Sequence, residues 1–316
     1  MRCRFRTGQR LILMLAALAA LEAGPAAGRA AELLRWKFQQ GEKLHYQMQL
    51  DTTIRSAAAA RTDKTAIAQT IDLTWTVTAV ATDGVATMTQ TIDRMRMKAT
   101  TPEGVMEVDS ASDSIDGPLA QSMAPIFKAL IGAEFTLKMT PTGRIRDVEV
   151  PARALDVLKA SPQLGSMLSP EALKDMTAQA TIPLPDEAVD VGGTWTDEKN
   201  LAGVKLKMTY TFEGPAELDR RKVDRISTKA DMEITLPEAE GVQAEMEAGE
   251  LTGEMFFDFA AGKLLSSSAK QNMAISIMAK EQSLRQEIQT LVSMRLVPPG
   301  EKDPPAGAPP AEKTSP

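Results

Sequence analysis

Apolar and polar side chains alternate with a period of two along most of residues 31–297. In residues 67–79, Ile71, Leu73 and Trp75 occupy one parity, while threonines and Asp72 occupy the other. This alternation is typical of a strand that buries one face and leaves the other in water. The same pattern returns in five further segments, 44–50, 204–212, 226–236, 251–259 and 265–277. The sequence therefore predicts a long, curved, mainly antiparallel β-sheet, half-barrel-like in outline.

Turn residues separate successive segments of this pattern. Asp83-Gly84 is a strong hairpin signal, because both residue types tolerate the backbone conformations of a tight turn. Further turns are predicted at residues 141–143, 219–222 and 260–263. Within residues 85–100 the apolar positions change parity near Ile92-Asp93. Either a β-bulge at this point or a strand exposed on both faces explains the change.

Helical spacing is confined to the middle of the chain. Apolar residues recur at helical spacing in residues 119–131, a short helix is expected after Pro151, and Ser169-Pro170 has the N-cap and first-turn residues of another. A few helices packed on one face of a sheet make an α+β fold. We expect one α+β domain over residues 31–297. The alternative is a division into halves 31–150 and 186–297, joined by the helical segment 151–185.

The first 30 residues have the three parts of a secretory signal peptide. Four arginines lie in residues 1–10, an apolar run follows at 11–21, and small residues lead up to Ala30. The apolar run is shorter than the roughly 20 residues that span a bilayer, which favours cleavage over retention as a membrane anchor. No later segment has the length and apolarity of a membrane span. We expect an exported chain, periplasmic or extracellular and soluble, without a transmembrane segment once it is processed.

Composition narrows the possible chemistry of the exported chain. Cys3 is the only cysteine and lies in the signal peptide, so disulfides, lipidation at a cysteine and Cys-type zinc sites are not expected. Residues 1–30 hold five of the 36 Lys and Arg and one of the 42 Asp and Glu, so the net charge of −6 becomes −10 without them. An acidic chain is a poor binder of nucleic acid. Residues 298–316 are rich in proline and are expected to form a disordered tail.

Catalytic and metal-binding motifs are scarce. His45 is the sole histidine, and its parity directs it to the polar face, which favours an exposed or structural role over that of a general base. The sequence has no Gly-x-Ser-x-Gly elbow, phosphate-binding glycine loop or His-Glu-x-x-His motif. We therefore predict no enzyme, cofactor or metal site, with a hydrolase that uses only carboxylates as the alternative. The glutamates from Glu238 to Glu254 could bind calcium, although a solvated acidic segment is favoured.

Methionine is the remaining compositional clue. The 18 methionines outnumber the eight Phe, three Trp and two Tyr together. Flexible thioether side chains suit ligands of variable shape such as lipids, although they also fill ordinary cores. The composition favours a non-catalytic binding protein for a hydrophobic small molecule, and the alternative is a module that contacts another envelope protein. The residues expected to line the ligand cavity are Met48, Trp75, Met123, Phe127, Met208, Met232, Met255 and Met273.

Three segments carry a resemblance to a known family. They are Leu34-Arg-Trp-Lys-Phe-Gln-Gln-Gly-Glu-Lys-Leu-His-Tyr46, interpreted as a bulky strand, Leu184 to Trp195 with its terminal Gly-Gly-Thr-Trp, and Phe257 to Ser266 with its Ala-Ala-Gly-Lys turn. Over nearly all of residues 33–295 the sequence resembles a family of secreted bacterial proteins of unknown function. This family implies no site, because no activity is assigned to it. The predicted outline is also similar to periplasmic lipid and lipoprotein carriers, which hold acyl chains in a half-barrel closed by helices.

Overall fold

The structure is a computed structural model that describes residues 31–58, 61–112, 128–152, 154–156, 181–201, 204–234, 242–279 and 282–298. Within them one antiparallel sheet has the strand order β6-β5-β3-β2-β1-β12-β11-β10-β9-β8-β7. Strand β5 pairs with the first half of β3, and β4 pairs with its second half. The strands are β1 (Lys43–Ala58), β2 (Arg61–Val80), β3 (Ala86–Thr101), β4 (Gly104–Asp109), β5 (Glu134–Met139), β6 (Ile145–Glu149), β7 (Thr194–Leu201), β8 (Val204–Leu218), β9 (Arg221–Ile234), β10 (Val242–Asp258), β11 (Lys263–Ala279) and β12 (Gln282–Leu296).

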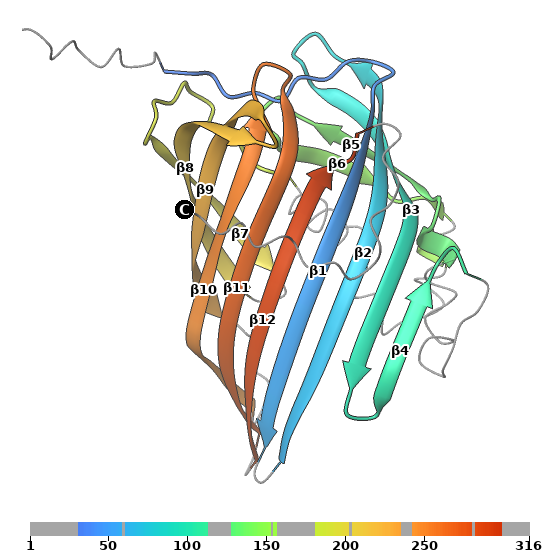
Figure 1. The fold of residues 1–316 in the computed structure, drawn as a ribbon, viewed down its shortest axis with the longest axis vertical. Coiled ribbons are helices and arrows are strands. Elements are labelled where there is room, and N and C mark those ends of the chain that lie inside the picture. Colours follow the sequence, from blue (N-terminus) through green and yellow to red (C-terminus); the bar gives the residue numbers. More distant parts are fainter. Residues whose placement is uncertain are drawn as a thin grey trace, which may run out of the picture.

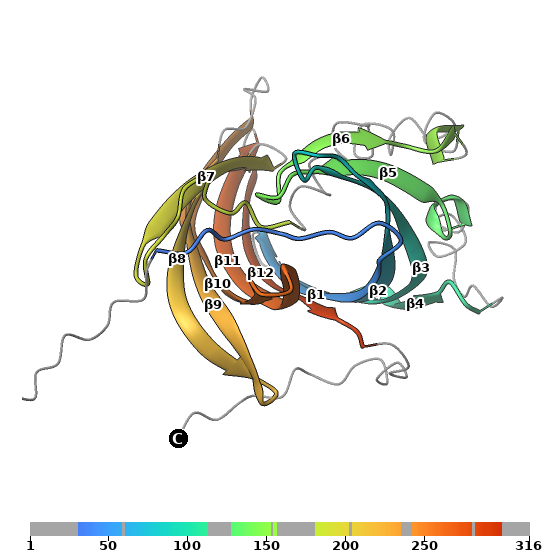
Figure 2. The ribbon, with the colours of Figure 1, turned by 90° about the horizontal axis from the view of Figure 1, so that it is seen from above.

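The first and last strands meet in the middle of this sheet. β1 and β12 pair from Tyr46↔Leu296 to Ala58↔Leu284, which joins the strands before residue 150 to those after residue 193. Figure 1 shows the long central strands converging toward one end, here called the narrow end, and the opposite end is the wide end. Seen from the wide end, the sheet is open and strongly curved (Figure 2). The predicted long antiparallel sheet is confirmed.

The two faces of the sheet differ in polarity. We call the inner face the one that carries Tyr46, Trp75 and Phe257, and the outer face the opposite one. Cα pairing places Leu44 opposite Trp75 and His45 opposite Thr74, so neighbouring residues alternate between the two faces. On β12 the same alternation leaves Arg285, Glu287 and Gln289 exposed and the residues between them half-buried. The period-two pattern in the sequence is therefore the alternation of an apolar inner face with a polar outer face.

The predicted turns are present, and of the two explanations given for the parity change in residues 85–100 the structure has the bulge. Asp83-Gly84 lies between β2 and β3, and residues 141–143 join β5 to β6. The β8–β9 hairpin closes through Asp219 and Arg220, whose φ angles of 49° and 66° are those of a type I′ turn. In β3 the pairing shifts between Leu73↔Ile92 and Asp72↔Arg94, which leaves Asp93 as the extra residue of a bulge.

The prediction of an α+β fold is wrong for the described residues, which are mainly β. Their helical residues are 128–130, 152 and 154–156, whereas single strands run for up to 20 residues. Strands this long use most of the described chain, which leaves few described residues for helices. The helices expected over residues 119–131 and 151–176 fall largely outside the described residues. No helix in the described part of the chain has the length and apolar character needed to cross a bilayer.

The segment before β1 crosses the wide end of the sheet (Figure 2). We call residues 31–42 the strap. Its backbone is tied to the β5–β6 turn by the bond from Trp36 N to Pro141 O (2.8 Å) and to the β10–β11 turn by the bond from Lys37 N to Gly262 O (3.2 Å). The bulky strand expected over residues 34–46 is thus only partly correct, since strand pairing begins at Lys43. Crossing the sheet end lets Leu34 and Trp36 point into its interior, where both are at most 2% exposed.

An aromatic cluster under the strap forms the centre of the core. The Trp36 ring meets Phe257 edge-on at 4.9 Å and lies 6.3 Å from Trp75, which in turn lies 5.0 Å from Tyr46. Edge-to-face and tilted contacts of this kind stabilise aromatic pairs beyond the area that they bury. Lys263 anchors the cluster from the side, because its ammonium donates to the Lys37 carbonyl and to Glu42 (2.8 Å). The wide end is therefore closed by packed side chains.

Candidate functional site

The inner face divides into two zones along the strands. In the wide zone, Tyr46, Leu73 and Phe257 are buried and belong to one continuous core cluster. In the narrow zone the inner side chains stay half-buried and are not packed against that cluster. The apolar members of the narrow zone on the four central strands are Leu50, Ile54, Ile67, Met273, Ile275, Ile277, Leu284, Ile288 and Val292.

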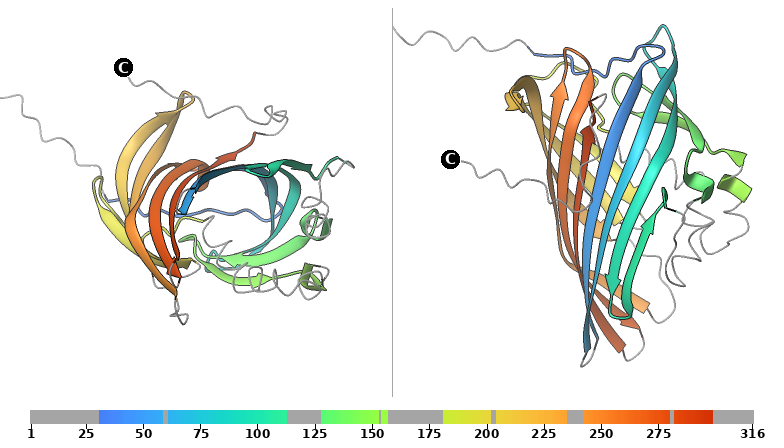
Figure 3. Two further views of the ribbon diagram at one scale, coloured as in Figure 1. Left: turned by 90° about the horizontal axis from the view of Figure 1, so that it is seen from below. Right: turned by 45° about the vertical axis from the view of Figure 1, so that its right-hand side comes forward.

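Strand pairing brings these apolar side chains into rows across the sheet. Ile54 on β1 is paired with Ile288 on β12, which is paired with Met273 on β11. Ile275 and Ile277 continue the surface toward the narrow end. Figure 3 shows these central strands side by side and converging at the narrow end. The rows form a partly exposed apolar surface on the concave side of the sheet, which we call the narrow patch.

A row of uncharged polar groups crosses the narrow patch between the Leu50–Val292 pair and the Ile54–Ile288 pair. Thr52 on β1 is paired with Thr290 on β12, and Thr290 is paired with Gln271 on β11. Gln69 on β2 lies opposite Leu50, one row closer to the wide end. All four polar side chains are half-buried. We call Gln69, Thr52, Thr290 and Gln271 the polar band.

Away from the strand ends, ionised groups are absent from the inner positions described for the four central strands. On β1 and β12, on β11 from Ser267 onward, and on β2 from Thr65 to Val77, these positions hold only apolar residues, Ser, Thr and Gln. Charged side chains on the described inner face lie at its margins, as Asp63 does at the tip of the β1–β2 hairpin. The outer face of the same strands carries Asp51, Arg55 and Glu287. The contrast gives the four central strands, between their ends, an apolar and electrically neutral concave lining.

Two titratable groups at the β7–β8 edge of the inner face have shifted pKa values, Lys199 on β7 and Tyr210 on β8. Burial lowers the pKa of Lys199, and the nearby Asp197 carboxylate opposes part of that change. Burial also raises the pKa of Tyr210, and the charge of Asp197 adds to that rise. The Tyr210 ring is stacked on Trp195 at 5.5 Å, and the Trp195 indole donates to Pro183 O at 2.7 Å. These contacts describe a packed sheet edge.

The six predicted cavity-lining residues that the structure describes share one face but lie in different surroundings. Trp75 is fully buried in the aromatic cluster, and Met208 and Met255 are also buried in the core. Met48 and Met232 are half-buried and pack against that core. Met273 lies in the narrow patch beside Ile288. Met123 and Phe127 fall outside the described residues.

Sequence reasoning missed the aliphatic residues of the narrow patch. Ile54 and Ile288 were not expected to contact a ligand, because the prediction was based on methionine content. The residue type alone does not show whether a position is packed in the core or exposed. A signal was present in the alternation that continues from Leu50 to Ile54 and from Leu284 to Val292. That alternation predicts which face of the sheet these side chains occupy. It does not predict how deeply they are buried, because their burial depends on where the strap packs.

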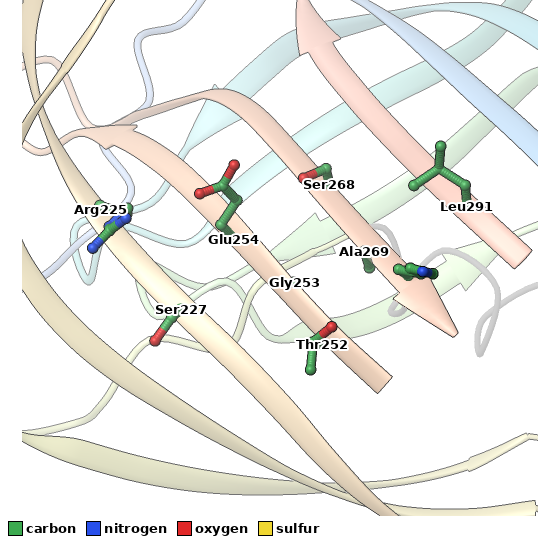
Figure 4. A pocket seen from close by; sticks show the side chains of 9 residues that line it. Arg225, Ser227, Thr252, Gly253, Glu254, Ser268, Ala269 and Leu291 are labelled. Atoms are coloured by element: carbon green, nitrogen blue, oxygen red, sulfur yellow. The ribbon is translucent and has the colours of Figure 1, made fainter. Parts of the chain in front are cut away.

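Two hollows in the surface lie away from the narrow patch. At the wide end, strap residues Glu32 and Leu33 and the tip of the β8–β9 hairpin border a cleft of about 880 Å³ with Phe259 in its wall. On the outer face, a groove of about 360 Å³ runs across β9, β10 and β11, and Arg225, Glu254 and Ser268 line it (Figure 4). Both hollows are bordered by charged side chains, unlike the narrow patch.

The remaining polar candidates lie on the outer face. His45 points outward as predicted, and its Nδ1 lies 2.9 Å from Thr74 Oγ1, which donates to the bulged Asp93. In the acidic segment, Glu247 accepts hydrogen bonds from Ser276 and Arg285, and these bonds lower its pKa. Glu238 and Glu240 fall outside the described residues. The described part of the chain contains no cluster of three or more His, Cys, Asp or Glu placed to hold a metal ion.

An open antiparallel sheet with a concave apolar face defines the class of fold. The chain belongs to a family of unknown function, DUF6263, whose model matches residues 83–262. This membership confirms the resemblance to an uncharacterised family. No curated protein matches the sequence.

Similar solved structures share little sequence with the chain. A lipovitellin structure concerned with lipid–protein interactions is 12% identical with a TM-score of 0.48, and the match covers 84% of this chain but 27% of lipovitellin. DynF of dynemicin biosynthesis from Micromonospora chersina is 8% identical with a TM-score of 0.20, covering 86% of this chain and 89% of DynF. An outer membrane channel from Pseudomonas putida F1 is 8% identical with a TM-score of 0.22, covering 87% and 100%. These values are too low to transfer a function or a ligand.

Proposed function

We propose that the protein is a non-catalytic binding protein that holds a hydrophobic or lipid-like molecule against the narrow patch. The observation that carries this proposal is the set of half-buried aliphatic side chains on the concave face, around Ile54, Ile288 and Met273. Removal of apolar surface of this kind from water lowers the free energy of the complex by roughly 25 cal/mol per Å². The polar outer face of the same strands keeps the opposite side compatible with water.

The same proposal places the protein outside the cytoplasm. Residues 1–30 have the sequence of a signal peptide. Cleavage after them would remove Cys3, the only cysteine, so the exported chain would contain no thiol. We expect protein recovered from the periplasm or medium of its host to begin near Ala31, as read by N-terminal sequencing. Recovery of chains that still begin at Met1 from the membrane fraction would support the retained-anchor alternative instead.

The binding surface can be tested with a matched pair of charge substitutions. In Ile288→Glu the new carboxylate lies in the narrow patch, whereas in Gln289→Glu it lies on the outer face of the same strand. We expect Ile288→Glu to weaken binding of the neutral dye Nile red by at least about tenfold, because an unpaired buried charge is costly. Gln289→Glu should leave the affinity within about twofold, since exposed surface substitutions have small effects.

Two outcomes would contradict this proposal, equal affinities in the variants and no binding by the parent chain, and a third outcome would report a change in folding. Equal affinities in both variants and the parent chain would place the dye elsewhere, and loss of dye binding in both would point to a change in folding. Thermal unfolding curves of the two variants separate these cases. Failure of the parent chain to bind Nile red, with no lipid extracted from protein purified from its host, would favour the alternative of an envelope interaction module.

A further inference from the structure

The polar band has hydrogen-bonding capacity that the described protein does not use. The Gln271 amide donates to Met273 Sδ at 3.9 Å, a weak contact. Thr52 Oγ1 and Thr290 Oγ1 are 3.4 Å apart, a long hydrogen bond. Among the described residues, no side chain or backbone group is recorded as a partner of the Gln69 amide. Each glutamine amide offers two N–H donors and one acceptor oxygen. Most of these donors and acceptors therefore lie on the concave face without a hydrogen-bond partner among the described residues.

The position of the polar band matters as much as its chemistry. It crosses β2, β1, β12 and β11 as a short polar strip, and apolar residues lie on both sides of it along the strands. Leu50 and Val292 lie next to it toward the wide end, and Ile54 and Ile288 lie next to it toward the narrow end. A few converging polar groups within an apolar surface are the usual means by which a binding site orients its ligand.

The inner side chains around the polar band also disfavour a ligand with a charged group at that position. Among the described residues, no Lys or Arg occupies an inner position of β1, of β12, or of β11 from Ser267 onward, and the buried Lys263 at the wide end is already paired with Glu42. A carboxylate or phosphate at the polar band would therefore have no cation to pair with. No Asp or Glu occupies these positions either, so an ammonium group would also be unpaired. A charge that leaves water without a partner carries a large free-energy cost.

We propose that the ligand of the narrow patch is a neutral amphiphile, with an uncharged hydroxyl, ester or amide group at the polar band and a hydrocarbon chain along the narrow patch. This inference rests on the proposed function and specifies its ligand class. Gln69 and Gln271 donate to the carbonyl or hydroxyl oxygens of the ligand, and Thr52 and Thr290 accept from its hydroxyl. From Thr52 to Ala58 the strand provides about 20 Å of length for the chain, at about 3.3 Å per residue.

A series of ligands with equal chain length tests the ligand class. Nile red bound to the mature chain is displaced with a monoacylglycerol, with the corresponding fatty acid at neutral pH, and with the corresponding alkyltrimethylammonium, all below their micelle concentrations. We expect the monoacylglycerol to displace the dye at concentrations at least about tenfold lower than either charged compound. Displacement by the fatty acid as effective as that by the monoacylglycerol overturns the ligand class.

A pair of arginine substitutions ties the preference to the polar band. Gln271→Arg places a cation among the inner residues and should reverse the order, so that the fatty acid becomes the stronger competitor. Asn272→Arg adds the same cation on the outer face of the same strand and should keep the order of the parent chain. An unchanged order in Gln271→Arg, or reversal in both variants, contradicts the assignment of the polar group to this band.

The two proposals fail in distinguishable ways. Binding of Nile red that the charged and neutral amphiphiles displace equally leaves the proposed function intact and removes only the ligand class. Absence of Nile red binding, together with no displacement by any compound, overturns the proposed function and the ligand class with it.

Discussion

Replacement of Trp36 with alanine is expected to lower the free energy of unfolding by about 3–5 kcal/mol, the usual cost of deleting a large buried aromatic side chain. The Trp36 side chain is 2% exposed and contacts Phe38, Trp75 and Phe257, so its loss leaves a cavity between the strap and the sheet. Urea unfolding followed by circular dichroism measures the change. The strap also offers an internal comparison, because Leu33 is 58% exposed. Leu33→Ala should change stability by less than about 0.5 kcal/mol.

Amide hydrogen exchange shows whether the effect reaches beyond the strap. Trp36 N and Lys37 N bond to the carbonyls of Pro141 and Gly262, which belong to the β5–β6 turn and the β10–β11 turn. If the strap holds these turns together, Trp36→Ala should increase exchange in both turns as well as in the strap. Faster exchange in the strap alone, with unchanged urea unfolding, would mean that the sheet is stable without it.

The arrangement within each hairpin could be predicted from the sequence, because it depends on local chemistry. Alternation of apolar and polar residues set the faces of the strands, Asp83-Gly84 marked a tight turn, and the parity change near Asp93 marked the bulge. The pairing of β1 with β12 could not be predicted in this way. One pair of partners, Met48 and Met294, is 246 residues apart in the sequence, and no local pattern specifies which strands become neighbours.

The candidate site was predicted only as a face. Parity placed Met48, Met208 and Met273 on one side of the sheet, and the structure agrees. Division of that face into a packed zone and a narrow patch depends on the strap, whose apolar alternation at Leu34 and Trp36 also fits an ordinary strand. The period of the pattern is the same in both cases, so only the tertiary structure separates a residue that fills the core from one that can meet a ligand.

The second large effect is expected at Gly143, in the turn between β5 and β6. Its φ angle is +78°, and a Cβ added there would overlap the carbonyl oxygen of Ile182 and lie 2.8 Å from Trp36 Nε1. Gly143→Ala therefore combines left-handed backbone strain of about 1–2 kcal/mol with overpacking of about 1–3 kcal/mol. We expect a total loss of about 2–5 kcal/mol in the free energy of unfolding, measured by urea denaturation.

Gly41 separates the two contributions. Its φ angle is +83°, nearly that of Gly143, but a Cβ added there would meet no atom within 4 Å. Gly41→Ala should therefore show only the backbone strain, about 1–2 kcal/mol. The difference between the two variants then measures how tightly the β5–β6 turn packs against the strap and Ile182. Equal losses in the two variants would show that the turn is not in close contact with Trp36, and would remove one of the two attachments by which the strap closes the wide end.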